Sequence, residues 1–114
     1  MAASDKVITT KTKPSPKLLR VALEENIRMG PETRRSASER LARRARRASE
    51  RERATAIRQA TRAVAAAEAY AREYQDGKRT QVEVVAELRR KFPWLGDDDL
   101  AERLGSYGYY LVIM

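Results

Sequence analysis

The chain has 114 residues, with 24 Lys and Arg against 16 Asp and Glu, for a formal net charge of +8. It contains no His and no Cys, and its five Gly form no Gly-rich phosphate loop, so we expect no enzyme, no cofactor, no metal and no small-molecule substrate. No apolar run approaches the ~18–20 residues of a membrane span, and the first residues lack a secretory pattern. We therefore expect an intracellular protein, soluble or held in an assembly, without a membrane partner.

The N-terminal part of the chain predicts a flexible segment followed by one short helix. Residues 1–15 are rich in Lys, Thr, Ser and Pro, which is typical of a flexible basic arm. We expect the helix over 16–30, because Ser15 suits the N-cap and Pro16 suits the first helical position. Gly30 then predicts its end. Apolar residues that recur every four positions predict its buried face: Leu19, Leu23 and Ile27.

Residues 31–76 predict one long helix that is rich in Arg and Ala. After the initial Pro31 the segment has no Gly or Pro, and it is dense in residues that favour helices. One stripe, at spacings of 4, 4 and 3, runs through it: Ala37, Leu41, Ala45, Ala48, Glu52, Ala56, Gln59, Ala63, Ala67, Tyr70 and Tyr74. This 11-residue period favours a nearly straight pairing with another helix. The overall prediction is an all-α protein, with one long basic helix (about 31–75) flanked by a short N-terminal helix and a small C-terminal helical unit.

The positive charge is concentrated in the first half of this long helix. Residues 34–62 contain 11 Arg and 3 Glu, whereas residues 63–114 carry a net charge of −2. At 100° per residue, seven of the arginines fall within a sector of about 100°, opposite the Ala stripe. We call them the arginine ridge: Arg40, Arg43, Arg44, Arg47, Arg51, Arg58 and Arg62. On a continuous helix this ridge would extend about 33 Å.

Guanidinium groups suit bidentate contacts with phosphate, so we predict that the arginine ridge binds DNA or RNA. The ridge carries no aromatic side chain, so its contacts are expected to go to phosphates, with little sequence readout and no base stacking. Three alternatives remain open. In the first, the ridge is a solvated surface or one that faces an acidic protein. In the second, the chain is a structural subunit of a virion or ribonucleoprotein-type complex. In the third, it is a coiled-coil adaptor or regulator.

Residues 80–114 predict a small helical unit with an apolar C-terminal tail. Thr80 and Glu83 form the capping-box pattern of a helix start, and Pro93 predicts its end. Its expected apolar face is Val82, Val85, Leu88 and Phe92. We expect Asp97 to cap a second, short helix that ends at Gly105. The cluster from Asp97 to Asp99 is therefore interpreted as a helix cap rather than a metal site or a DNA-reading helix start.

Aromatic and apolar residues outside the ridge predict contacts with a protein partner or with a second copy of the chain. A core of some 30 residues is smaller than a domain that usually folds alone, and the last residues are the most apolar part of the sequence. The candidate interface residues are Leu41, Ala63, Ala67, Tyr70, Tyr74, Trp94, Tyr109, Tyr110, Leu111 and Ile113.

Overall fold

The computed structural model describes residues 13–28 and 36–114, and all regular elements within these ranges are helical. In chain order they are α2 (Pro16–Asn26), α3 (Ala37–Arg44), α4 (Glu50–Gln75), α5 (Gln81–Lys91), the 3-10 turn η2 (Pro93–Leu95) and α6 (Leu100–Ile113). The prediction of an all-α protein with one long helix between shorter flanking helices is confirmed. Among the described helices, none is both long enough and apolar enough to cross a membrane.

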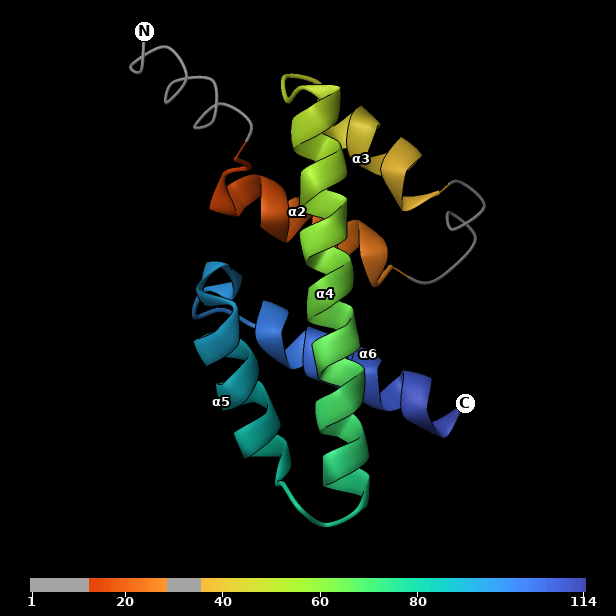
Figure 1. The fold of residues 1–114 in the computed structure, drawn as a ribbon, viewed down its shortest axis with the longest axis vertical. Coiled ribbons are helices and arrows are strands. Elements are labelled where there is room, and N and C mark those ends of the chain that lie inside the picture. The colour runs from red at the N-terminus through yellow and green to blue at the C-terminus, as the bar shows by residue number, and fades with distance from the viewer. Residues whose placement is uncertain (1–12, 29–35) are drawn as a thin grey trace, which may run out of the picture.

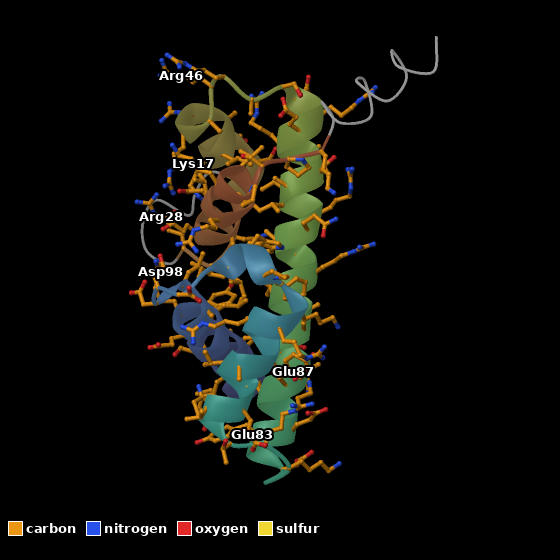
Figure 2. All side chains as sticks on the ribbon, turned by 90° about the vertical axis from the view of Figure 1, so that its left-hand side faces the viewer. Lys17, Arg28, Arg46, Glu83, Glu87 and Asp98 are labelled. Carbon is orange, nitrogen blue, oxygen red and sulfur yellow. The ribbon has the colours of Figure 1, made fainter. Side chains whose placement is uncertain are left out.

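The long helix α4 organises the fold. In Figure 1, α2 crosses its upper half and α6 crosses its lower half, and the side view in Figure 2 places α2, α3 and α6 on the same side of α4. The side of α4 that faces them carries small residues that are fully or almost fully buried: Ala56, Ala60, Ala63, Ala67 and Ala71. The Ala stripe is therefore covered by helices of the same chain, because small side chains let α2 and α6 approach α4 closely.

Leucines from the shorter elements complete the core. The predicted face of α2 is confirmed, since its apolar positions are at most 8% exposed. The hydroxyl of Ser15 caps this helix by accepting a hydrogen bond from the backbone N–H of Leu18 at 3.2 Å. The predicted end at Gly30 lies outside the described residues, as does the arm before residue 13. The core leucines are Leu18, Leu19, Leu23, Leu41, Leu88, Leu95, Leu100 and Leu104.

The buried face of α5 differs from the prediction. Val84 and Leu88 are fully buried, whereas Val82 is 79% exposed. A helix turns about 200° over two residues, so the burial of Val84 places Val82 on the solvent side. The predicted start is confirmed, because Thr80 and Glu83 form both hydrogen bonds of a capping box, at 3.2 and 2.8 Å.

The prediction of one continuous helix over 31–76 is wrong. Five non-helical residues separate the end of α3 from the start of α4. Ser49 caps the start of α4. Its hydroxyl accepts from the backbone N–H of Glu52 at 3.0 Å, and the Glu52 carboxylate accepts from the backbone N–H of Ser49 at 2.9 Å. This capping box satisfies the amide groups that a helix start leaves open. Residues 31–35 lie outside the described part of the chain.

Two further interactions hold the chain in this turn. The guanidinium of Arg53 donates hydrogen bonds to the backbone carbonyl of Ala45, at 3.3 Å, and to that of Ala48. The turn also folds α3 back against α2 and α4, which buries Leu41 completely. Burial of a leucine side chain contributes about 1.5–3 kcal/mol, so tertiary packing outweighs the helix propensity of Ala and Arg.

The C-terminal segment is one helix of 14 residues, and the prediction that Gly105 ends it is wrong. Both Gly105 and Gly108 are buried inside α6, where they face α5 and α4 respectively. A glycine inside a helix costs about 1 kcal/mol relative to alanine. Here close contact between helices offsets that cost, so the tail after Gly105 continues as helix.

Candidate nucleic-acid interface

Two members of the arginine ridge, Arg40 and Arg44, point toward a buried carboxylate. Glu25 of α2 is 0% exposed and accepts hydrogen bonds from Arg40 Nε at 2.9 Å and from Arg44 Nη1 at 2.7 Å. Arg28 adds contacts at 3.2 and 3.3 Å. Burial raises the pKa of Glu25, but the hydrogen bonds from Arg44, Arg40 and Arg28 outweigh it and hold that pKa below its usual value. Arg40 and Arg44 therefore join α2 to α3.

The other five ridge arginines are exposed: Arg43, Arg47, Arg51, Arg58 and Arg62. Within the described part of the chain none of the five forms an ion pair, and Arg58 donates only to the Thr55 hydroxyl, at 3.1 Å. Arg51, Arg58 and Arg62 lie within about 40° of one another on α4, opposite its buried alanines. They extend about 16 Å along the helix. The predicted 33 Å ridge is not formed, because the chain turns between α3 and α4.

Further cations surround the same end of the molecule. A groove of about 440 Å³ between the start of α2 and the α3–α4 turn is lined by Lys17, Arg43, Arg46 and Arg47, among others. Figure 2 shows Lys17 and Arg46 toward this end. Together with Lys13 and the α4 arginines they form what we call the basic end: Lys13, Lys17, Arg43, Arg46, Arg47, Arg51, Arg58 and Arg62. Lys13, Lys17 and Arg46 were not among the sequence-predicted site residues.

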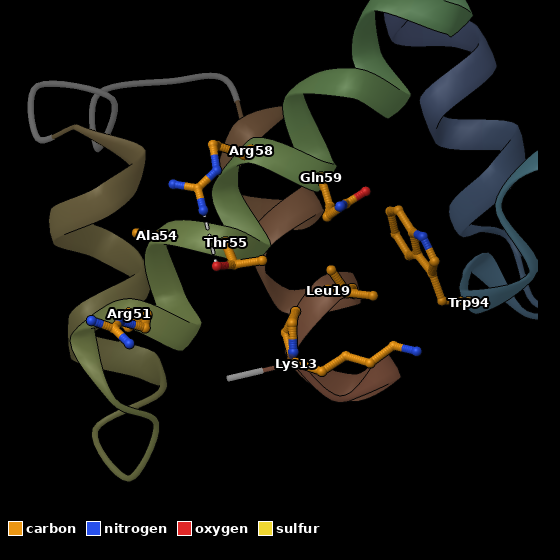
Figure 3. Close-up of a pocket in the computed structure, with 9 residues that line it drawn as sticks. Lys13, Leu19, Arg51, Ala54, Thr55, Arg58, Gln59 and Trp94 are labelled. Carbon is orange, nitrogen blue, oxygen red and sulfur yellow. Dashed lines mark hydrogen bonds between the residues drawn. The ribbon is translucent and has the colours of Figure 1, made fainter. Parts of the chain in front are cut away.

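A larger pocket, of about 830 Å³, brings an aromatic side chain to the basic end. Its lining combines three cations with polar and apolar groups: Lys13, Pro14, Leu19, Arg51, Ala54, Thr55, Arg58, Gln59 and Trp94. None of these lining residues is acidic. In Figure 3, Trp94 lies across the pocket from Arg51 and Arg58, with Leu19 and Gln59 between them. Trp94 also packs edge-on against Phe92, with ring centroids 5.9 Å apart.

The arginine ridge itself carries no aromatic side chain, as its sequence shows. In the folded chain, however, Trp94 lines the same pocket as Arg51 and Arg58. Trp94 follows α5 and is separated from Arg58 by 36 positions, so no periodicity within one helix links the two residues. The signal that would place Trp94 beside the ridge is the packing of η2 against α2, which a single sequence does not reveal. Trp94 was predicted at a protein interface instead.

The remaining predicted interface residues divide into interior and surface positions. Leu41, Ala63 and Ala67 are fully buried in the intramolecular core. Tyr70 is half-buried, and the guanidinium carbon of Arg79 lies 4.8 Å from its ring centroid. These four residues therefore pack within the chain itself.

The predicted residues near the chain end lie around the last turns of α6. Tyr109 packs edge-on against Tyr74 of α4, at 5.6 Å between centroids, and Leu111 is half-buried. The side chains of Tyr110, Ile113 and Met114 are 40%, 54% and 77% exposed. This end of α6 is thus an apolar surface.

The acidic cluster before α6 has a structural role that differs in detail from the prediction. Asp97 is not the N-cap. Asp99 occupies that position but makes no capping hydrogen bond with its side chain. Asp98 accepts hydrogen bonds from the Arg20 guanidinium and, at 3.3 Å, from the Leu100 N–H; the Arg20 bond is the main cause that lowers the pKa of Asp98. Within the described residues, no group of three or more acidic side chains is arranged to hold a metal ion.

No protein-family model, curated protein or solved structure matches this chain.

Proposed function

We propose that this chain is a non-enzymatic protein that binds nucleic acid by placing phosphates against its basic end. The supporting observation is the uneven pairing of its arginines. Arg40 and Arg44 are ion-paired with Glu25, whereas the eight cations of the basic end form no ion pair within the described residues. Clustered like charges repel one another, and phosphates would relieve that repulsion while releasing their own counterions.

The residue types at the basic end favour contacts with the phosphate backbone. Six of its eight cations are arginines, whose guanidinium groups match phosphate oxygens in a bidentate geometry. Such contacts fix the position of a nucleic acid without specifying its sequence. We therefore expect binding to DNA and RNA with weak sequence preference and strong salt dependence.

The test compares two triple variants of equal charge change. Arg51→Gln, Arg58→Gln and Arg62→Gln remove the α4 part of the basic end. The control replaces three exposed cations outside the basic end, Arg72, Lys78 and Lys91, by Gln. Binding to labelled single-stranded DNA, single-stranded RNA and duplex DNA is measured by fluorescence anisotropy at low salt.

We expect the first variant to lose at least about tenfold in affinity, because each phosphate contact contributes separately, and the control to stay close to the unmodified protein. Circular dichroism melting verifies that both variants fold. Equal losses in the two variants would contradict the location of the site. Absence of binding by the unmodified chain would contradict the proposal itself and favour a solvated or protein-facing basic surface.

A second candidate function rests on the exposed apolar end of α6. We propose that Tyr110, Ile113 and Met114 associate with the same surface of a second copy, as in a small subunit of a nucleoprotein assembly. Exposed apolar side chains gathered at one site favour protein contacts. A coiled-coil adaptor that uses the Ala stripe is not proposed, because α2 and α6 cover that stripe.

A further inference from the structure

We propose that the pocket between Trp94 and Arg58 binds one unpaired nucleotide of a single strand, with its base stacked on the Trp94 indole and its phosphates on Arg51 and Arg58. This inference rests on the proposed function and deepens it, because it names the class of nucleic acid. A base inside a duplex is already stacked and paired, so its face is not available to an indole. A single strand offers both base faces and phosphates.

The pocket offers groups that suit each part of a nucleotide. On one side, the guanidinium groups of Arg51 and Arg58 provide positive charge, and the Thr55 hydroxyl orients Arg58 through a hydrogen bond of 3.1 Å. On the other side, Trp94 is half-buried, so part of its indole remains accessible. The Gln59 amide lies between them (Figure 3) and can donate to or accept from a base edge.

The size and charge of the pocket fit the same ligand. Its volume of about 830 Å³ is within the range of about 300–1,000 Å³ that is usual for small-ligand sites. Lys13 adds a third cation, and among the described residues that line the pocket none is acidic. A cationic groove combined with an aromatic ring is the arrangement that binds single strands without sequence preference.

Trp94 is the only tryptophan of the chain, so its fluorescence reports on this pocket alone. We would titrate the full chain with three ligands: a short oligo(dT), an abasic strand of equal length, and a duplex of equal length. The expected result is that oligo(dT) quenches the Trp94 emission, while the abasic strand and the duplex bind with little quenching. The abasic strand should bind about 5- to 100-fold more weakly than oligo(dT), which corresponds to the contribution of one stacked base.

Two variants test the same site by anisotropy with labelled oligo(dT). Trp94→Leu removes the stacking surface, and we expect about 5- to 100-fold weaker binding. Because Trp94 also packs on Phe92, a second variant leaves the core untouched. Ala54→Glu adds a carboxylate at an exposed position that lines the pocket. Ala69→Glu, at an exposed position further along α4, is its matched control and should bind at least several-fold more tightly than Ala54→Glu.

The possible outcomes separate this inference from the proposed function. Strand binding without quenching, together with wild-type affinity in Trp94→Leu, would overturn the stacking site and leave phosphate binding in place. Equal quenching by the abasic strand would also overturn the stacking site. If neither strand nor duplex binds at low salt, the proposed function fails and the stacking site fails with it.

Discussion

Gly108 of α6 lies directly against the backbone of Ala67 in α4: a Cβ at Gly108 would be 2.6 Å from the Ala67 carbonyl carbon and oxygen. Gly105, one helical turn earlier, has more room, because a Cβ there would first meet Val85 at 3.6 Å. The two glycines of α6 are therefore not equivalent. Only Gly108 is required for the close contact between α4 and α6.

The two glycines predict opposite effects of substitution by alanine. Gly108→Ala forces α6 away from α4, and overpacking of this kind costs about 1–3 kcal/mol in the free energy of unfolding. Gly105→Ala makes only ordinary contacts and removes a flexible residue from a helix, so it should stabilise the protein by about 0.5–1 kcal/mol. Urea unfolding of the two variants measures the difference. A destabilised Gly105→Ala together with an unaffected Gly108→Ala would contradict this packing.

The buried carboxylate of Glu25 predicts a second contrast. Glu25→Gln removes the buried negative charge that Arg40 and Arg44 both contact, and loss of one partner from such a cluster costs about 3 kcal/mol. Glu24→Gln removes contacts to Arg44 and Arg103 at 3.1 and 3.6 Å that are partly exposed, which are worth at most about 1 kcal/mol. Equilibrium unfolding of the two variants compares the two losses in the free energy of unfolding. Equal effects would show that the Glu25 cluster does not join α2 to α3.

The lowered pKa of Glu25 predicts a pH dependence of stability. Its folded-state pKa lies below its usual value of 4.5, so Glu25 contributes stability above that value and loses it as the pH falls through the lowered pKa. The free energy of unfolding should therefore fall more steeply between about pH 5 and pH 3 in the unmodified protein than in Glu25→Gln. The other carboxylates are present in both proteins and do not affect the comparison. Parallel curves would contradict the role of Glu25.

The exposed end of α6 predicts self-association that depends on its apolar side chains. Ile113→Asp should shift the protein toward monomer in sedimentation equilibrium, because a charge in an apolar contact is costly to desolvate. Val82→Asp is the control, since Val82 is also exposed, at 79%, but lies at the start of α5. An unmodified protein that is monomeric at all concentrations, or an equal effect of the control, would rule out this contact.

Local patterns predicted the starts of α2 and α5 correctly, but they placed the N-cap of α6 at Asp97, where the structure has Asp99. Ser15 and Thr80 cap α2 and α5 as expected. Ser49 and Glu52 carry the same S/T-x-x-E pattern as Thr80 and Glu83, and Ser36 caps α3 by accepting from the Glu39 N–H at 3.1 Å. These two starts were missed, because the absence of Gly and Pro favoured one continuous helix. Capping residues, together with the burial of Leu41, therefore outweighed helix propensity in this segment.

Interactions between distant segments could not be predicted from one sequence. In a continuous helix the arginines of the ridge would share one face. No local sequence pattern indicates that Arg40 and Arg44 instead form ion pairs with Glu25. The same holds for Trp94, which reaches the pocket only through the packing of η2 against α2. Gly105 was interpreted as a helix end, although it lies inside α6 and packs against α5.

The central claim is that the exposed arginines of α4 contact nucleic-acid phosphates, and the salt dependence of binding tests it most directly. For single strands, each lost phosphate contact lowers the slope of log affinity against log salt by about 0.7. Replacement of Arg51, Arg58 and Arg62 by Gln should therefore reduce the slope by about 2, while the control triple variant at Arg72, Lys78 and Lys91 keeps the slope of the unmodified protein. An unchanged slope in the first variant, or equal reductions in both, would contradict the claim.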